Sequence, residues 1–510
     1  MSKFANRPPQ RVSALGYEGT PIPTYEGDAG QARTAKAELF LLGVSNMVSE
    51  DTFYESGAAR DKRFTDLIHE VTREDPVWVA QFAAWLRNDA NMRSAPIVVA
   101  CEYVKAGGRN GRSVISSVLQ RADEPGECLA YWVSTHGRAI PQPIKRGVAD
   151  ATQRLYTEAN HLKWDGKGRA WRFTDVIQMV HVVPRDRRQS VLFRHLLDDR
   201  YAKDHEAIYD WREYLPVLDA NDRLEMIEEA RRRDKLESGE LAELIARAHW
   251  SWERISSWIG GPMTAKVWES IIPNMGYMAL LRNLRNFDQA GVSESVKAQI
   301  IVKLADPEEV ARSRQFPLRF LSAKNQQETY TWHAALERAI ELSVSNVAGF
   351  PGRTLILVDR SGSMSDRLSG RSQAERWQVA GIFGAALAKR CEEAELASFD
   401  NYVEVVPFNK PILKVVDQFT PRGGTDLIGA IRTAYNGHDR IVVLTDEQMA
   451  GDYGPVLDIG ATPIYLFNLA GYAPAASIPN VITFGGGLTD AAFRLLPLIE
   501  RGAKAQWPWG

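Results

Sequence analysis

Cysteine is scarce in this 510-residue chain, because its three cysteines, Cys101, Cys128 and Cys391, are widely spaced and form no Cys-x-x-Cys pair. Such a set encodes neither a disulfide framework nor a zinc site, and it suits a reducing compartment. No apolar run approaches the roughly 20 residues that a membrane-spanning helix needs. The N-terminus from Met1 to Arg11 is polar and lacks the apolar stretch of a signal peptide. We therefore expect a soluble, cytoplasmic protein that contacts no membrane.

The chain also lacks an excess of charge of either sign, with a formal net charge of −2. A strongly basic total is the usual footprint of a nucleic-acid binder, so any such site must be a local patch. One segment fits, since residues 138–203 contain 14 Lys or Arg and 7 Asp or Glu, a local charge of +7. Residues 204–243 restore the balance with 6 basic and 13 acidic side chains. The plain alternative is a set of solvated helix faces.

Aromatic residues are interleaved with the basic ones in this segment. Trp164 and Trp171 stand beside Lys163, Lys167 and Arg169. Proteins that bind single strands use this combination, because rings stack on bases and cations contact phosphates. Tryptophans on helices are more often core anchors, so composition alone leaves both explanations open.

The length exceeds the size at which one hydrophobic core stops growing, so we expect at least two domains. From about Arg33 to Val347 apolar residues return every three or four positions, which is a helical pattern. Helices are predicted over residues 76–87 and 95–106, and the pairing repeats every 35 to 45 residues or so, as in helical solenoids. No repeated sequence motif is visible, so a globular helical bundle is the alternative.

The pattern changes after residue 350. Thr354 to Val358 is a short apolar run typical of a strand covered on both faces. Strands and helices then alternate, which predicts a doubly wound α/β domain. The further predicted strands are 403–408, 441–444, 464–468 and 481–484, and the predicted helices are 373–393, 426–435 and 489–501. The expected organisation is a helical-repeat domain over residues 1–350 and an α/β domain over residues 351–510.

Hydroxyl and carboxylate side chains follow two predicted strands and precede a predicted helix of the α/β domain. Asp359, Ser361 and Ser363 come directly after the first strand, Thr425 stands before a helix, and Asp446 follows another strand. Ligands of such sheets bind beyond the carboxyl ends of the strands, so these loops are expected to converge. Oxygen ligands without nitrogen or sulfur suit a hard divalent cation, most simply Mg²⁺. The alternative is that these side chains only cap turns and helices.

The same residues argue against catalysis. Two-metal phosphoryl transfer needs a dense set of carboxylates, whereas hydroxyls predominate here. Asp426 and Glu447 are the carboxylates that would change this expectation, although both are expected to lie outside the ligand set. We therefore expect no enzyme, and a metal-dependent nuclease is the least favoured hypothesis.

Asp359-x-Ser361-x-Ser363 with Thr425 and Asp446 resembles the metal-ion-dependent adhesion site of von Willebrand A domains. The resemblance implies that the serines and the threonine contact the ion, that the aspartates act largely through water, and that an acidic group of a partner fills an open position.

The order of the two domains, together with several sequence stretches, resembles the Ro autoantigen (TROVE-domain) family in its bacterial form. These stretches are residues 85–87 with 91–95, 141–149, 173–181, 278–285 and 316–322. The resemblance covers nearly the whole chain and implies HEAT-like helices closed into a ring, with the A domain joining the ends. It also implies that single-stranded 3′ ends of misfolded RNAs enter the hole while small Y-type RNAs bind the outer surface.

The resemblance further implies a set of RNA-binding residues. Lys163, Arg169 and His181 match family residues that contact Y RNA, with Lys145 and Arg146 as neighbours. Arg282 and Arg285 lie three apart on one helical face and are candidates for the lining of the hole. A buried, hydrogen-bonded His181 is the alternative for that residue, and ion pairs with acidic neighbours are the alternative for the two arginines.

The leading functional hypothesis is an RNA chaperone or scaffold, monomeric in its protein part, that passes RNA to an exoribonuclease. The alternative is a protein-interaction adaptor whose cation grips an acidic side chain of a partner.

Overall fold

The computed structural model describes residues 21–23, 29–31, 34–45, 57–201, 211–327, 329–367, 374–446, 458–469, 481–484 and 507–509. The chain divides into two compact units, one containing Met275–Lys504 and the other Tyr17–Asn274 with Ala505–Gly510. Helices give way to alternating strands and helices at Arg353, while the helices after residue 275 group with the α/β domain. The division at 350/351 and the closed ring stay predictions. Within the described residues no helix is long and apolar enough to cross a bilayer.

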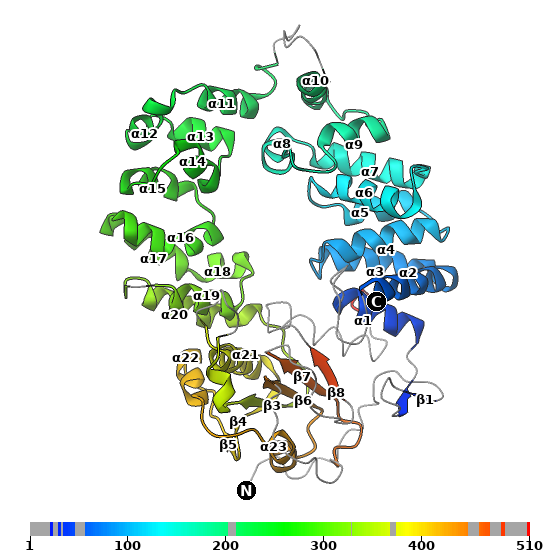
Figure 1. Cartoon of the computed structure of the whole chain (residues 1–510), viewed down its shortest axis with the longest axis vertical. Helices are drawn as coiled ribbons and strands as arrows, with labels where there is room; N and C mark the ends of the chain where they lie inside the picture. The colour runs from blue at the N-terminus through cyan, green and yellow to red at the C-terminus, as the bar shows by residue number, and fades with distance from the viewer. Residues whose placement is uncertain are drawn as a thin grey trace. The chain divides into compact units, whose positions relative to one another are not determined.

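The unit that contains Tyr17–Asn274 is almost entirely helical (Figure 1). It begins with an antiparallel pair of short strands, β1 (Pro21–Pro23) and β2 (Ala29–Gln31). Its helices are α1 (Ala35–Ser45), α2 (Gly57–Glu74), α3 (Pro76–Asn88), α4 (Ser94–Lys105), α5 (Gly111–Val118), α6 (Glu124–His136), α7 (Gln142–Leu155), α8 (Glu158–Trp164), α9 (Phe173–Val180), α10 (Arg187–Tyr201), α11 (Pro216–Glu225), α12 (Glu229–Glu237), α13 (Ala242–Ala248), α14 (Trp252–Ile259), α15 (Ala265–Ile271) and η1 (Ile272–Asn274).

Helix α3 shows how the sequence sets these elements. The Asp75 carboxylate accepts a hydrogen bond from the Trp78 N–H at 3.1 Å, and Pro76 occupies the first turn, where its missing N–H costs nothing. Val79, Phe82 and Leu86 form the buried face. The predicted helices 76–87 and 95–106 are both confirmed within one residue at each end.

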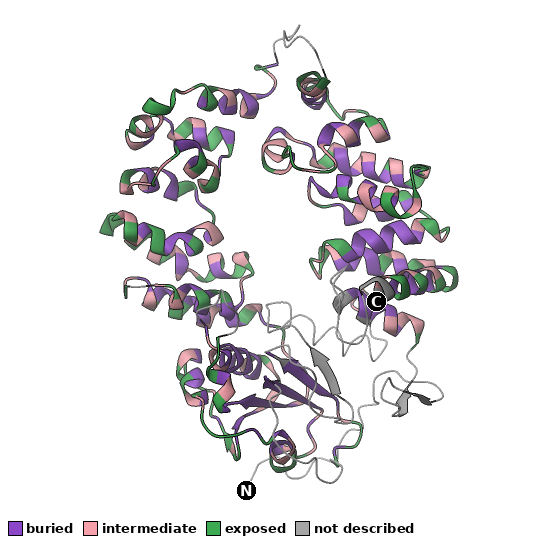
Figure 2. Cartoon of the chain, in the orientation of Figure 1, coloured by how far each residue is buried: buried purple, intermediate pink, exposed green. Residues whose placement is uncertain are grey.

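Helices contact mainly their neighbours in sequence. The main contacts in this unit join helices at most three positions apart, such as α3 with α4, α5 with α7 and α11 with α13. Buried residues lie on the faces that these helices turn toward one another (Figure 2). This local pattern is that of stacked helical repeats and not of a globular bundle. Cys101, Cys128 and Cys391 are free cysteines.

The last described residues of the chain complete an aromatic cluster in this unit. Trp507 lies with its ring centroid 4.9 Å from that of Trp78, edge to face. Trp509 lies 5.3 Å from Trp78 and 5.7 Å from Trp85. Phe40 of α1 contacts both rings, and Phe82 of α3 contacts Trp509. The C-terminal segment therefore packs on helices that lie more than 400 residues earlier in the sequence.

The other unit combines helices with the α/β domain. Its elements are α16 (Tyr277–Ala290), α17 (Glu294–Leu304), α18 (Pro307–Ser313), α19 (Pro317–Asn325), α20 (His333–Ser343), η2 (Val344–Asn346), β3 (Arg353–Asp359), η3 (Gly362–Ser365), α21 (Arg376–Arg390), β4 (Glu393–Phe399), β5 (Val403–Val405), α22 (Ile412–Val416), η4 (Asp417–Phe419), α23 (Leu427–Ala434), β6 (Arg440–Thr445), β7 (Ile464–Asn468) and β8 (Val481–Phe484).

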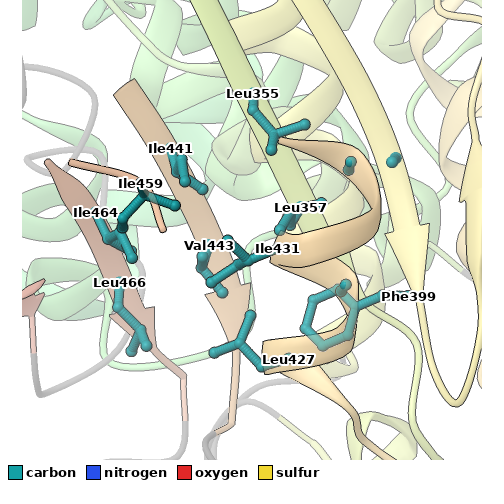
Figure 3. Close-up of a cluster of buried hydrophobic side chains, with 13 residues drawn as sticks. Leu355, Leu357, Phe399, Leu427, Ile431, Ile441, Val443, Ile459, Ile464 and Leu466 are labelled. Carbon is teal, nitrogen blue, oxygen red and sulfur yellow. The ribbon is translucent and has the colours of Figure 1, made fainter. Parts of the chain in front are cut away.

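The six strands from β3 to β8 form one sheet in the order β5-β4-β3-β6-β7-β8. All neighbours are parallel except β4 and β5. The chain moves from β3 outward to β4 on one side and later to β6 on the other, so a topological switch point lies at β3, where such folds bind ligands. One face of the sheet packs on α23 through Leu355, Leu357, Val443, Leu427 and Ile431 (Figure 3).

The predicted α/β domain is confirmed with one missed strand. Strands 464–468 and 481–484 are as predicted, and β3 and β6 are each slightly longer. The predicted helix 373–393 spans only Arg376–Arg390, and β4 begins at Glu393. Glu393, Ala394 and Glu395 are weak strand formers, yet β4 is held by pairing with β3 and by burial of its second half. Strand 403–408 is shorter than predicted, and helix 489–501 lies outside the described residues.

Candidate functional site

The first candidate site lies at the carboxyl end of β3. Asp359 is the last residue of that strand and is fully buried. Its Oδ1 accepts a hydrogen bond from the Ser361 N–H at 2.7 Å. The hydroxyls of Ser361 and Ser363 are 3.1 Å apart, so the structure brings these three predicted residues together.

The end of β6 supplies the next oxygens. Thr445 Oγ1 donates to Asp359 Oδ2 at 2.5 Å, and the following Asp446 is fully buried. Asp446 Oδ2 lies 3.0 Å from Nη1 of Arg376, the first residue of α21. Arg376 was not predicted to belong to this site, because nothing in its local sequence ties it to a residue 70 positions later.

The loop that contains Thr425 approaches the same place. Gly423 O accepts a hydrogen bond from the Gly362 N–H at 3.2 Å, and Thr425 is buried. Asp426 caps α23 by accepting a hydrogen bond from the Gly429 N–H at 2.8 Å. Glu447 lies outside the described residues.

A second network fixes the loop after β3 from the other side. Arg360 is buried, and it donates to Asp400 at 3.0 Å and to Glu404 at 2.8 Å. Arg422 pairs with the same two carboxylates. These charge-assisted hydrogen bonds hold the loop that presents Ser361 and Ser363 in one conformation.

The Asp359 carboxyl is buried close to a second carboxylate, that of Asp446. Burial raises the pKa of the Asp359 carboxyl to about 6, although hydrogen bonds from Thr445 and Ser361 act in the opposite direction. The nearby Asp446 carboxylate also raises it. Within the described residues no group of three or more His, Cys, Asp or Glu is arranged to hold a metal. A bound ion would therefore depend on the hydroxyls as well as on the two aspartates.

The second candidate site is a basic surface around Trp164 at the end of α8. The guanidinium of Arg121 lies 4.4 Å from the centroid of the Trp164 ring, and the Lys163 ammonium lies 5.1 Å from it. Arg169 pairs with Asp123 at 3.0 Å and with Glu127 at 3.4 Å. Lys163 and Arg121 therefore share the Trp164 ring, and Arg121 lies outside the basic segment identified from the sequence. Arg121 also pairs with Asp123, the carboxylate that pairs with Arg169.

The two tryptophans of this segment are both half-buried. Trp171 lies against α6, where a Cβ added at Gly126 would meet the Trp171 Cβ at 3.1 Å. Trp164 is half-buried with cations on its ring. Such a ring offers a surface on which a base can stack, and the neighbouring cations can contact phosphates.

Asp165 anchors the loop between α8 and α9 through hydrogen bonds and ion pairs. Its carboxylate accepts from the Phe173 N–H at 2.9 Å and pairs with Arg172 at 3.2 Å and His161 at 3.1 Å. Burial would raise the pKa of Asp165, but these hydrogen bonds outweigh it and lower the pKa. The loop that carries Arg169 is therefore anchored at its ends.

The remaining predicted RNA-binding residues are exposed or half-buried. His181 ends α9 in the left-handed conformation, with φ 52°, and is exposed, which contradicts the alternative of a buried helix histidine. Lys145 and Arg146 lie near the start of α7. Arg282 and Arg285 are exposed on α16, in the other unit.

The basic segment is only partly neutralised. Among the described residues of 138–203, carboxylates pair with Arg169, Arg172, Arg185, Arg188, Arg194 and Arg200. The cations without a carboxylate partner in this described part are Arg138, Lys145, Arg146, Arg154, Lys163, Lys167 and Arg187. Positive charge therefore remains available at the surface of the described part of this segment, in agreement with the predicted basic patch.

Comparison with known proteins adds family information. Residues 244–341 match the TROVE domain model. The chain is 23% identical to the RNA-binding protein RO60 of Deinococcus radiodurans over 353 residues, covering 64% of this chain and 62% of that protein. It is 29% identical to RO60 of Caenorhabditis elegans over 159 residues, covering 28% and 25%. A 109-residue stretch is 35% identical to telomerase protein component 1 of Rattus norvegicus, of which the chain spans only 4%.

A solved structure supports the fold over most of the chain. The crystal structure of the Deinococcus radiodurans RO (RSR) protein superposes with a TM-score of 0.71 and 18% identity, covering 93% of this chain and 100% of that one. This likeness agrees with the helical repeats and the C-terminal α/β domain described above. The TROVE match over residues 244–341 and the sequence relatives show that the chain is similar to RO60 proteins and contains a region that matches the TROVE domain.

Proposed function

We propose that this protein binds small noncoding Y-type RNA and the single-stranded 3′ ends of misfolded RNAs. The observation that carries the proposal is the surface around Trp164, where Arg121 and Lys163 lie against the ring. An aromatic face flanked by cations stacks on an unpaired base and contacts its phosphate, without reading sequence. The names of the relatives, RNA-binding proteins in two organisms, support the same class of ligand.

The proposed role is that of a chaperone or scaffold in RNA quality control or degradation. The protein component is a monomer in the cytoplasm that catalyses no reaction itself and hands its RNA to an exoribonuclease. Of the predicted RNA-binding residues, Lys145, Arg146, Lys163, Arg169 and His181 belong to the helical unit Tyr17–Asn274. Arg282 and Arg285 would contact RNA from the other unit.

The test compares RNA of different strandedness. Purified protein should bind a single-stranded oligoribonucleotide about tenfold or more tightly than a duplex of the same sequence, because paired bases cannot stack on Trp164. Fluorescence anisotropy measures both affinities, and sequencing of copurified RNA identifies the cargo. Equal affinity for the two forms would contradict the proposal.

We further propose that the oxygen cluster at β3 and β6 holds one divalent cation, Mg²⁺ by ligand type. Ser361, Ser363 and Thr425 would contact the ion, and Asp359 and Asp446 would act largely through water. The two buried carboxylates and the adjacent hydroxyls fit such an ion, and Arg376 already balances part of the charge of Asp446. The bound ion would offer an open position to an acidic group of a partner.

Magnesium should stabilise the α/β domain against heat. A ligand that binds only the folded state adds about 2.7 kcal/mol at a concentration of 100 Kd. Differential scanning calorimetry with and without Mg²⁺ should show an increase in Tm for the natural protein and none for Asp359→Asn. Asp417→Asn, at an exposed carboxylate elsewhere in the domain, is the control. An equal increase in Tm for Asp359→Asn would exclude this site.

The adaptor hypothesis makes the opposite prediction. It requires Mg²⁺-dependent binding of an acidic peptide by a protein that has no preference for RNA over a neutral polymer. The two functions are therefore separable with the same purified protein.

A further inference from the structure

The helical unit contains a pocket of about 250 Å³ that no predicted site uses. It lies where α8, α10 and α11 begin. Its lining residues are Tyr156, Thr157, Glu158, Ala159, Arg185, Arg188, Gln189, Leu192, Leu215 and Val217. Two arginines therefore stand beside mainly apolar walls.

The walls are rigid and partly flat. Tyr156, Leu192 and Leu215 are buried. The Tyr156 ring stacks on Phe173 with centroids 3.7 Å apart and an interplanar angle of 8°, which fixes its orientation. Gln189 is also buried, and its amide donates to the carbonyls of Gln153 and Tyr156. The interior is thus preformed.

Glu158, the acidic side chain of the pocket, already has hydrogen-bond partners for both carboxylate oxygens. Glu158 Oε1 accepts from Arg188 Nε at 3.0 Å, and Oε2 accepts from the N–H groups of Val217 and Leu218 at 2.8 and 3.1 Å. Glu158 therefore uses the N–H groups of the first turn of α11 and two donors of Arg188, and only the remaining donors of the arginines can hold another anion.

The arginines keep donors for a further anion. Arg185 is exposed and pairs through Nε with Asp186 at 2.9 Å, and Arg188 uses Nε and Nη2 for Glu158. Within the described residues, Arg188 Nη1 and Arg185 Nη2 have no acceptor. A guanidinium has five N–H donors, so each can also bind a phosphate.

We propose that this pocket takes one nucleotide of a bound single-stranded RNA. The base enters between the apolar walls, and its phosphate lies at Arg185 and Arg188. The volume is below the usual 300 Å³ or more of a drug-sized site, which suits one base and not two. The inference rests on the proposed RNA-binding function and adds a binding site to it. Arg185 of this site comes four residues after the exposed His181 in the sequence.

The test places a large side chain in the pocket at Ala159, a half-buried lining residue. Ala159→Phe adds a ring beside the space of the base, whereas Arg185→Gln removes one charge at the rim and leaves Glu158 paired with Arg188. Arg231→Gln, at an exposed and ion-paired arginine of α12, is the charge-matched control. Affinities are measured with a short single-stranded oligoribonucleotide, with the same ribose-phosphate chain lacking bases, and with free uridine monophosphate. Circular dichroism confirms that each variant is folded.

Ala159→Phe should weaken binding of the oligoribonucleotide about tenfold and leave the base-free chain unaffected. Arg185→Gln should weaken both ligands severalfold, and Arg231→Gln neither. The pocket is excluded if folded Ala159→Phe binds the oligoribonucleotide as the natural protein does, or loses the base-free chain equally. Free uridine monophosphate binding as tightly as the oligoribonucleotide would overturn the assignment to RNA. If the natural protein binds no RNA, the proposed function fails and this inference with it.

Discussion

Alanine in place of both Trp507 and Trp509 should lower the free energy of unfolding of the helical unit by about 3–5 kcal/mol. The two rings contact Phe40, Trp78 and Trp85, so their removal opens a space beside apolar residues that are otherwise buried. Thermal and urea unfolding followed by circular dichroism measures the loss.

The control is an aromatic side chain without such neighbours. Tyr402 is 77% exposed, so Tyr402→Ala should change stability by less than about 0.5 kcal/mol. A second measurement uses the chain truncated before Ala505, to which a synthetic peptide of residues 505–510 is added. The peptide should restore part of the lost stability. If the alanine variant unfolds like the natural protein, the packing of the C-terminal segment contributes nothing.

Glutamine at Lys145, Arg146 and Lys163 together should weaken single-stranded RNA binding by about 30-fold or more near physiological salt, because each lost phosphate contact also loses the release of a counterion. These three cations have no carboxylate partner in the described part of the chain, so their full charge is available to phosphates. The weakening should be similar for different RNA sequences.

The matched control removes three charges that carboxylates already neutralise. Arg194, Arg231 and Arg312 are exposed and lie within ion-pair distance of Asp198, Glu228 and Glu309. Their triple replacement by glutamine has the same effect on net charge and should weaken binding no more than about threefold. Equal losses in the two triple variants would mean that net charge alone, and not this surface, attracts RNA.

The α/β domain could be predicted because most of its strands are short apolar runs in the sequence. Ile464 to Asn468 is such a run, and it forms β7 at the predicted bounds. β4 was missed because its first residues resemble a helix end, and only pairing with β3 makes them a strand. A sequence pattern shows which secondary structure a segment prefers locally. The strand conformation of β4 depends instead on pairing with β3, 40 positions earlier in the sequence.

The candidate metal site was predictable in part for a similar reason. Parallel strands end at one edge, so Asp359 and Asp446 could be placed together from the order of elements alone. Arg376 could not be placed with them, because the sequence does not indicate which strand end the first residue of a helix faces. The salt bridge to Asp446 is visible only in three dimensions.

The basic surface shows the same limit. Charge counting found Lys163 and Arg169, yet it could not tell that Asp123 pairs with Arg169 while Lys163 has no such partner in the described residues. It also missed Arg121, which lies far from them in sequence and reaches the Trp164 ring.

The most direct test of the central claim is the salt dependence of RNA binding by the natural protein. The logarithm of the association constant should fall linearly with the logarithm of salt concentration, at about 0.7 per phosphate contact and a total slope of about −2 or steeper. An uncharged nucleic-acid analogue of the same base sequence should bind far more weakly. A slope near zero, or equal affinity for the uncharged analogue, would contradict an electropositive surface that holds single-stranded RNA.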